Sequence, residues 1–304
     1  MAPRARLALL GCVLCVVGCA IVGVLAFEWP LARSHDASSL AAFMSLTVNA
    51  RVAEDATWIT EHATAIPFVI LGAALMLVAV LRRRPRLAFV VPIAMGGSNA
   101  TTEALKQGIA HLRFSALLGY DQIASASFPS GHATAAMSAA LCAVVVAPPL
   151  VRPLASLFGA AFSLAVSYSI LIAGWHYPSD VLGGYFVAGA WIFLALAALG
   201  GSELLRPSRT AVAESTTIRA ASIPAALGLG IIAAALVTSA LVSGPAQIDG
   251  SLIIGAALVA ALALALPTGL LVALRPRNPA RAAGAAGTRG RPLTAVARSN
   301  SSVG

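Results

Sequence analysis

With 304 residues, of which 59% are hydrophobic and 10% charged, and a mean hydropathy of +0.88, the chain does not have the composition of a soluble domain. A formal net charge of +9 on a soluble chain would suggest a nucleic-acid partner, but here the cations flank apolar runs and aromatic residues make up only 6%. All four cysteines lie inside apolar runs, where a disulfide framework is not expected. Composition therefore excludes a soluble nucleic-acid binder and predicts a membrane protein.

Apolar runs of the length that crosses a bilayer recur along the chain. A transmembrane helix needs roughly 20 such residues, and eight runs qualify, which predicts an all-α, polytopic membrane helix bundle. They cover residues 7–27, 63–81, 87–105, 133–151, 154–174, 181–199, 220–243 and 252–274.

Basic residues predict the orientation, because cytoplasmic segments of membrane proteins carry an excess of Lys and Arg. If both ends of the chain are cytoplasmic, sixteen of the twenty Lys and Arg residues fall inside, while nine of the eleven acids and all five histidines fall outside. We therefore predict a multi-pass cell-membrane protein with both termini cytoplasmic. The excess of Arg over Lys is typical of a GC-rich bacterial genome.

The predicted spans divide the chain into four parts. Residues 1–200 form a six-helix membrane domain, and residues 201–219 a cytoplasmic linker. Residues 220–274 add two transmembrane helices, and residues 275–304 a basic cytoplasmic tail that is predicted to be disordered because it lacks aromatic residues. Within the first part, the external stretch 28–62 predicts a short helix on the membrane surface.

Polar side chains near the spans converge on the extracytoplasmic face. Asn99, Glu103 and Lys106 are spaced i, i+4, i+7, so they share one face of the third span. The other groups are Phe-Pro-Ser-Gly-His at 128–132 and Gly-Trp-His-Tyr-Pro-Ser-Asp at 174–180, both at ends of spans. Polar groups cost a few kcal/mol each in a membrane and are therefore functional candidates.

Three of these residues, together with Arg113, which follows seven residues after Lys106, are suited to holding a phosphate. Lys106 supplies a point charge and Arg113 a bidentate fork for phosphate oxygens. Ser130 and Gly131 stand at the start of a predicted helix, where a hydroxyl, backbone N–H groups and the helix dipole all favour an anion.

Two histidines and an aspartate add catalytic groups. His132 and His176 can divide the work of proton donor and nucleophile. Asp180, four residues after His176, can accept a hydrogen bond from it and fix its tautomer. The neighbouring cations disfavour a metal at these three residues, so no metal and no cofactor is expected.

The pattern resembles the type 2 phosphatidic acid phosphatase superfamily of integral membrane lipid phosphatases. The pattern of that family is Lys-x6-Arg-Pro, Pro-Ser-Gly-His and Ser-Arg-x5-His-x3-Asp. Here the second block is intact at 129–132, the first has Phe114 in place of Pro, and the third has Ile170 in place of Arg. The resemblance covers about residues 58–199.

The resemblance implies a phosphatase core in residues 1–200 and a phosphohistidine intermediate. It makes His176 the nucleophile, Asp180 its orienting partner and His132 the general acid. The phosphate-binding residues that it implies are Lys106, Arg113, Ser130 and Gly131. The implied substrate is a phosphorylated lipid, such as a polyprenyl diphosphate, phosphatidic acid or phosphatidylglycerol phosphate; membrane lipids are the other partners, and nucleic acid is not one.

The isoleucine at position 170 leaves an alternative open. Loss of a preorganised charge from a transition-state clamp commonly costs on the order of 10²-fold or more in rate. The alternative is a catalytically weak or inactive relative that binds phosphorylated lipid or serves as a membrane scaffold. A transporter is a third hypothesis, disfavoured because the polar groups crowd at one face rather than at the membrane midplane.

Overall fold

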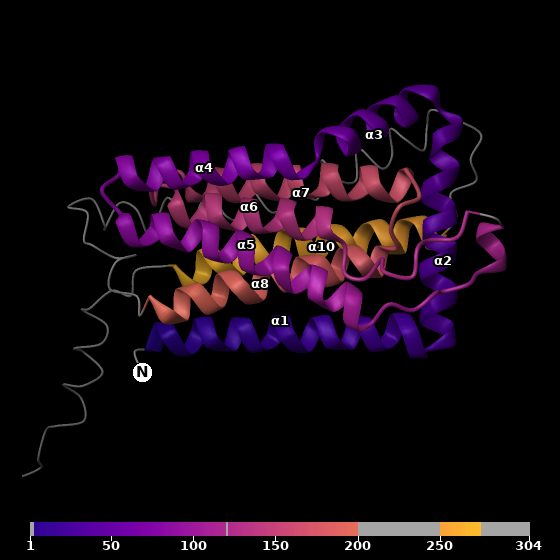
Figure 1. Cartoon of the computed structure of the whole chain (residues 1–304), viewed down its shortest axis with the longest axis horizontal. Helices are drawn as coiled ribbons and strands as arrows, with labels where there is room; N and C mark the ends of the chain where they lie inside the picture. The colour runs from indigo at the N-terminus through magenta and orange to yellow at the C-terminus, as the bar shows by residue number, and fades with distance from the viewer. Residues whose placement is uncertain (1–2, 120, 200–249, 275–304) are drawn as a thin grey trace, which may run out of the picture. The chain divides into compact units, whose positions relative to one another are not determined.

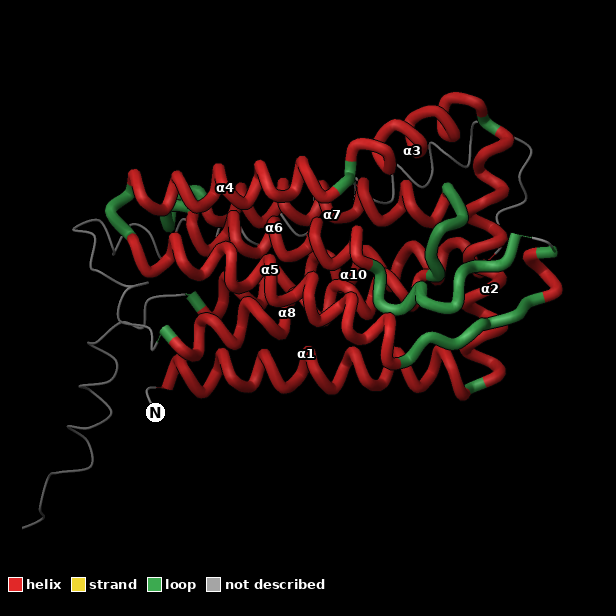
Figure 2. Tube along the Cα trace, in the orientation of Figure 1, coloured by secondary structure: helices red, strands yellow, loops and turns green. Residues whose placement is uncertain are grey.

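The computed structural model describes residues 3–119, 121–199 and 250–274. These residues form helices and no strand, so the predicted all-α class is confirmed. Most of the helices lie side by side in a bundle (Figure 1, Figure 2), in one compact unit that ends at Leu274. The bundle helices are α1 (Pro3–Glu28), α4 (Ala65–Leu81), α5 (Pro85–Gly108), α6 (Gly131–Val146), α7 (Arg152–Ile172), α8 (Pro178–Ala198) and α10 (Gly250–Ala273). The predicted linker at 201–219, span at 220–243 and tail at 275–304 lie outside the described residues.

Several of the described helices can cross a membrane. Four of them, α1, α7, α8 and α10, are both long and apolar enough, and α4 makes a fifth if it is joined with the preceding helix across a 63° bend. α6 is apolar but has only 16 residues. α5 has 24 residues, but its second half is polar. The described residues thus form a polytopic helical bundle, while the number of eight spans stays a prediction.

The stretch between α1 and α4 contains two helices where the sequence predicted one. They are α2 (Pro30–Ser45) and α3 (Ala50–His62), joined by a short 3-10 turn, η1 (Leu46–Val48). Trp29 is extended, as the residue before a proline prefers to be, so the chain turns sharply at the end of α1. α2 then runs across the end of the bundle (Figure 1) and buries Leu40 and Phe43 against it.

Small residues allow the central helices to approach closely. α6 is buried along nearly its whole length between α5, α7 and α8. A Cβ on Gly159 of α7 would lie 2.8 Å from the Cβ of Ala140, so the glycine sets the α6–α7 distance, as is common in membrane bundles. α10 packs on α7 and α2, where the Tyr168 hydroxyl donates to the Ala256 carbonyl at 2.9 Å.

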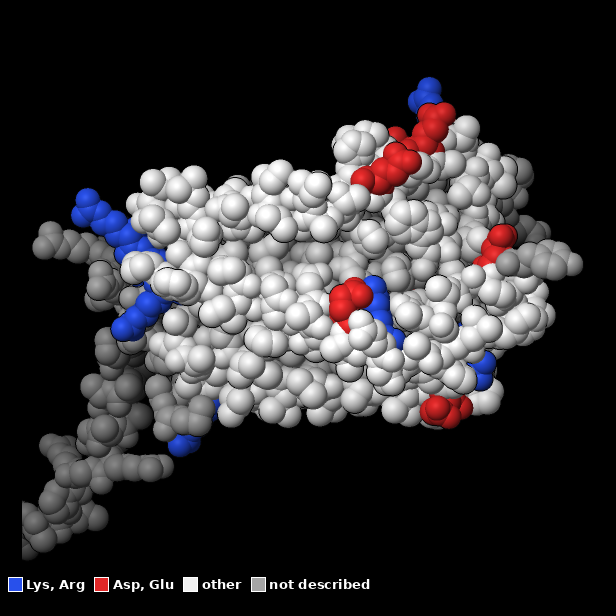
Figure 3. Space-filling view, viewed as in Figure 1, with Lys and Arg blue, Asp and Glu red and all other residues white. Residues whose placement is uncertain are grey.

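Charged side chains lie mainly at the two ends of the helix bundle, where the antiparallel helices begin and end. Basic side chains cluster at the turn between α4 and α5, and acidic side chains cluster at the opposite end, over α3 (Figure 3). The end of α5 and the starts of α6 and α8 lie at this second end of the bundle (Figure 1). All three predicted sequence blocks therefore reach the same end of the molecule.

Candidate active site

Lys106, in the last turn of α5, points toward the start of α6. Lys106 Nζ lies 2.9 Å from Glu103 Oε1, one turn earlier, and its side chain is 19% exposed against 61% for Glu103. A Cβ on Gly131 would lie 3.4 Å from the lysine nitrogen. The missing side chain at Gly131 therefore leaves the ammonium close to the backbone at the start of α6.

Ser130 caps α6 and also ties it to α8. Its buried hydroxyl accepts from the Ala133 N–H at 3.4 Å, and its own N–H donates to the Asp180 carbonyl at 2.9 Å. N–H groups in the first turn of a helix have no partner within the helix, and the helix dipole places partial positive charge there. Together with Lys106, this end of α6 has the charge and the hydrogen-bond donors that suit an anion such as phosphate.

The two predicted histidines face each other beside this anion site. His132, in the first turn of α6, and His176, just before α8, have ring centroids 6.3 Å apart. Gly174, with φ of +72°, makes the turn that ends α7 and brings His176 back toward α6. A group held between the rings would contact both histidines.

Asp180 lies on the other side of His176. Its Oδ2 is 3.4 Å from His176 Nδ1, which is within ion-pair range but long for a hydrogen bond. The same oxygen accepts from the Tyr177 N–H at 2.9 Å, which fixes the carboxylate in the first turn of α8. With Nδ1 turned to the aspartate, Nε2 is the nitrogen that faces away from Asp180 for a substrate.

Arg113 lies in a different setting from Lys106. Its side chain is 4% exposed, and its two terminal nitrogens bind two carboxylates: Nη2 pairs with Asp180 Oδ1, and Nη1 donates to Asp36 Oδ2 at 3.0 Å. It also donates to the hydroxyls of Ser179 at 2.8 Å and Ser127 at 3.2 Å. A phosphate would have to compete with these partners, so a phosphate-binding role for Arg113 stays a proposal.

Asp36 is a site residue that the sequence did not indicate. It comes from α2, its side chain is 10% exposed, and it accepts from Arg113 and from both the N–H and the hydroxyl of Ser179. Burial raises the pKa of Asp36 to about 6, because desolvation outweighs the attraction of the nearby guanidinium. In the sequence it is one acid in a mixed-charge stretch, 77 residues before Arg113, with no local motif to mark it.

Comparison with protein families gives one match. Residues 87–204 match the model described as PAP2 superfamily. The chain is thus similar to the PAP2 superfamily over this segment. The segment contains all seven predicted site residues, and members of the superfamily are usually phosphatases, which supports a phosphatase. No curated protein and no solved structure matches the chain.

Ile170, the position at which the sequence resemblance leads us to expect an arginine, is buried. Ile170 lies near the end of α7 with no exposed surface, among the apolar side chains of the main core. The preceding Ser169 bonds to the Ala165 carbonyl of its own helix at 2.8 Å. This position therefore contributes packing in the present chain, not charge.

Proposed function

We propose that the chain is a membrane phosphatase of lipid phosphates or diphosphates, acting on the extracytoplasmic face through a phosphohistidine. One observation carries the proposal. Lys106, the N-terminus of α6, His132 and the His176–Asp180 pair come from different helices and meet at one end of the bundle, within the PAP2 segment.

In the first half of the reaction, the phosphate lies on the N-terminus of α6 beside Lys106. His176 Nε2 attacks phosphorus, the new N–P bond forms, and the P–O bond to the lipid breaks. The negative charge of the bound phosphate favours the protonated form of His132, which gives its proton to the leaving oxygen. Asp180 stabilises the proton on His176 Nδ1, and its 3.4 Å contact shortens as the imidazole gains charge.

The second half regenerates the histidine. A water molecule attacks the phosphorus of the phosphohistidine, and His132 takes its proton. The N–P bond breaks and inorganic phosphate leaves. Backbone N–H groups and Lys106 stabilise the charge on the transferring phosphoryl group in both halves.

An apolar cavity beside the site supports a lipid substrate. A cavity of about 490 Å³ lies between α4, α5 and α6, and its lining includes Asn99 and Ala135, about one turn from Glu103 and His132 respectively. A larger cavity of about 680 Å³ lies between α1, α5 and α8; Lys106 and the two histidines line neither cavity. We favour the smaller cavity for the hydrocarbon chain because its polar end continues the face of α5 that carries Lys106.

Charge distribution supports the extracytoplasmic face. The basic cluster lies at the turn between α4 and α5, and the site lies at the opposite end of α5 (Figure 3). Because cytoplasmic segments carry the excess of Lys and Arg, the site faces away from the cytoplasm.

Two observations favour a second candidate, a weakly catalytic or inactive relative that binds phosphorylated lipid or acts as a scaffold. Ile170 brings no charge to the phosphate, and Arg113 is already bound to Asp36 and Asp180. The two predicted phosphate-binding cations are Lys106 and Arg113. Lys106 is paired with Glu103, a well-exposed acid, whereas Arg113 is paired with two buried acids.

The test is trapping of the covalent intermediate in the purified protein. A panel of phosphorylated lipids is first screened for phosphate release, and the best substrate is then used with a radioactive phosphate. We expect alkali-stable, acid-labile label on the wild type and on His35→Asn, an exposed histidine of α2, but none on His176→Asn. Full turnover by His176→Asn would contradict the mechanism. Inactivity of the wild type on every lipid, with binding retained, would favour the second candidate.

A further inference from the structure

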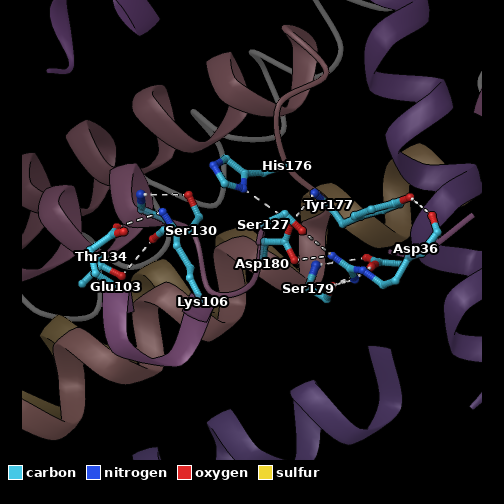
Figure 4. A network of polar contacts seen from close by, with 12 residues as sticks. Asp36, Glu103, Lys106, Ser127, Ser130, Thr134, His176, Tyr177, Ser179 and Asp180 are labelled. Carbon is cyan, nitrogen blue, oxygen red and sulfur yellow. Dashed lines mark hydrogen bonds and ion pairs between the residues drawn. The ribbon is translucent and has the colours of Figure 1, made fainter. Parts of the chain in front are cut away.

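A buried charge network lies on the side of Asp180 that faces away from His176 (Figure 4). It consists of one guanidinium, Arg113, between two carboxylates, Asp36 and Asp180. The mechanism above uses Asp180 alone from this group. The network is of interest because Asp36 comes from α2, which lies outside the matched PAP2 segment.

The three charges are held in a fixed geometry. Their side chains are 4%, 10% and 0% exposed for Arg113, Asp36 and Asp180, so each has lost most of its water and depends on its partners. The guanidinium also stacks on the Tyr177 ring at 3.9 Å. Arg113 therefore cannot turn toward one carboxylate without leaving the other unpaired.

Ser179 also binds Asp36, which attaches Asp36 a second time to the first turn of α8. Asp36 Oδ1 accepts the Ser179 N–H at 3.0 Å, and Oδ2 accepts its hydroxyl. Ser179 directly precedes Asp180. Asp36 is thus linked to Asp180 both through the arginine and through the backbone.

The division of the arginine's hydrogen bonds matters for His176. An arginine with a single carboxylate partner favours two parallel hydrogen bonds to both of its oxygens. With Asp36 present, Arg113 gives one nitrogen to each carboxylate and meets Asp180 at Oδ1 only. Oδ2 is then left for Tyr177 and His176.

We propose that Asp36 is a positioning residue: it holds Arg113 and Ser179 so that Asp180 Oδ2 stays directed at His176. Its role in turnover rests on the proposed function, and it makes α2, the helix across the end of the bundle, part of the catalytic apparatus. The charged and titratable groups that act on Asp36 are Arg113, Asp180 and Tyr177, and Ser179 donates two hydrogen bonds to it.

Steady-state kinetics of Asp36→Asn provide the first test, with Asp55→Asn, an exposed acid of α3, as the matched control. A misplaced catalytic group costs up to about 10²-fold. We expect Asp36→Asn to lower kcat by about tenfold or more with KM within about twofold. Asp55→Asn should match the wild type, and Asp36→Glu should recover part of the loss.

The pH profile separates positioning from loss of folded protein. Because the pKa of Asp36 is about 6, its charge is present at pH 7 and largely absent at pH 5. The ratio of wild-type to Asp36→Asn kcat should therefore be largest above pH 6 and approach one near pH 5. A ratio that is independent of pH would overturn the proposal, as would wild-type kcat in the variant.

Histidine NMR tests the same geometry without turnover. The protein is labelled with ¹⁵N-histidine, and the His176 signal is assigned by its loss in His176→Asn. In the wild type this signal should report a proton on Nδ1. In Asp36→Asn it should report a changed mixture of tautomers. This readout holds even if no substrate is found, so failure of the proposed function is distinguishable from failure of this inference. If Asp36→Asn does not fold, Ser179→Ala, which removes the hydroxyl that contacts both Asp36 and Arg113, should shift the same signal; an unchanged signal would overturn the inference.

Discussion

Ile170 is the residue at which the sequence resemblance leads us to expect an arginine. The residue is fully buried in the apolar core, and its carbonyl accepts from the Trp175 N–H at 3.0 Å at the end of α7. A cation at this position would need either a phosphate or a carboxylate beside it. The nearby carboxylate Asp180 already shares Arg113 with Asp36.

We therefore expect Ile170→Arg to destabilise the fold rather than restore activity. A buried charge without a partner costs a few kcal/mol. Thermal unfolding in detergent should show a lower midpoint for Ile170→Arg, while Ile170→Leu, which keeps the volume, stays close to the wild type. A stable Ile170→Arg protein with faster phosphate release would show instead that the guanidinium reaches the substrate.

Asp36 gives stability a pH dependence whose sign can be worked out. Its pKa of about 6 in the folded protein exceeds the ordinary value of about 3.9. Between these values the folded state holds a proton that the unfolded chain has released. The stabilising contribution is therefore complete below about pH 4 and is lost as pH rises through 6.

Asp36→Asn removes this titration. The unfolding midpoint of the wild type minus that of Asp36→Asn should therefore decrease between pH 4 and pH 7. The measurement is a series of thermal scans at half-unit pH intervals, with Asp55→Asn as the control. A difference that stays constant or increases over this interval would contradict the assigned pKa direction.

At the scale of helices, the site depends on the close approach of α8 to α6. A Cβ on Gly184 would lie 2.6 Å from the Ser130 carbonyl oxygen and 3.0 Å from the Thr134 nitrogen. Both contacts are with backbone, which cannot move aside as a side chain does. The glycine thus permits the Ser130–Asp180 hydrogen bond that joins the two helix starts.

Gly184→Ala should therefore displace the start of α6. Overpacking of this kind costs about 1–3 kcal/mol, and the anion site at Ser130 moves with the backbone. We expect a lower unfolding midpoint and a higher KM for phosphorylated lipid. Gly250→Ala at the start of α10 is the control, because a Cβ there meets nothing within 4 Å and alanine favours the helix. Equal behaviour of the two variants would contradict this account of the α6–α8 contact.

The sequence predicted the bounds of the helices more accurately where the apolar runs were continuous than where they were short or interrupted. α1, α7, α8 and α10 match the predicted spans within a few residues. α6 ends at Val146, five residues before the predicted end, because Pro148 and Pro149 follow and cannot continue the helix. The stretch 28–62 is polar on average and contains no apolar run of membrane length. A search for apolar runs therefore could not show that it forms two helices.

Site residues were predictable only where the chain places them in motifs. The spacing of His176 and Asp180 brings them together within one turn of chain, and the structure has them 3.4 Å apart. Asp36 could not be found in this way, because it meets Arg113 through the crossing of α2 over the bundle end, which depends on tertiary packing. The carboxylate partners of Arg113 were missed for the same reason.

At the scale of the whole molecule, orientation in the membrane follows from charge. The described basic cluster lies at the turn between α4 and α5, and acidic side chains lie at the other end, with α3 (Figure 3). The positive-inside rule predicts that the first end is cytoplasmic and that the end with the site is extracytoplasmic. An exposed residue at each end can report this directly: Arg83 in the α4–α5 turn and His35 on α2.

Single cysteines at these two positions, in a variant without the four native cysteines, provide the measurement. A membrane-impermeant maleimide added to intact cells should label His35→Cys at once, because α2 is predicted to lie outside, and should label Arg83→Cys only after permeabilisation. Phosphate release by both variants on the best lipid substrate shows that they are folded. Labelling of Arg83→Cys in intact cells, with His35→Cys protected, would invert the topology and place the site in the cytoplasm. The substrate would then have to be a lipid of the inner leaflet.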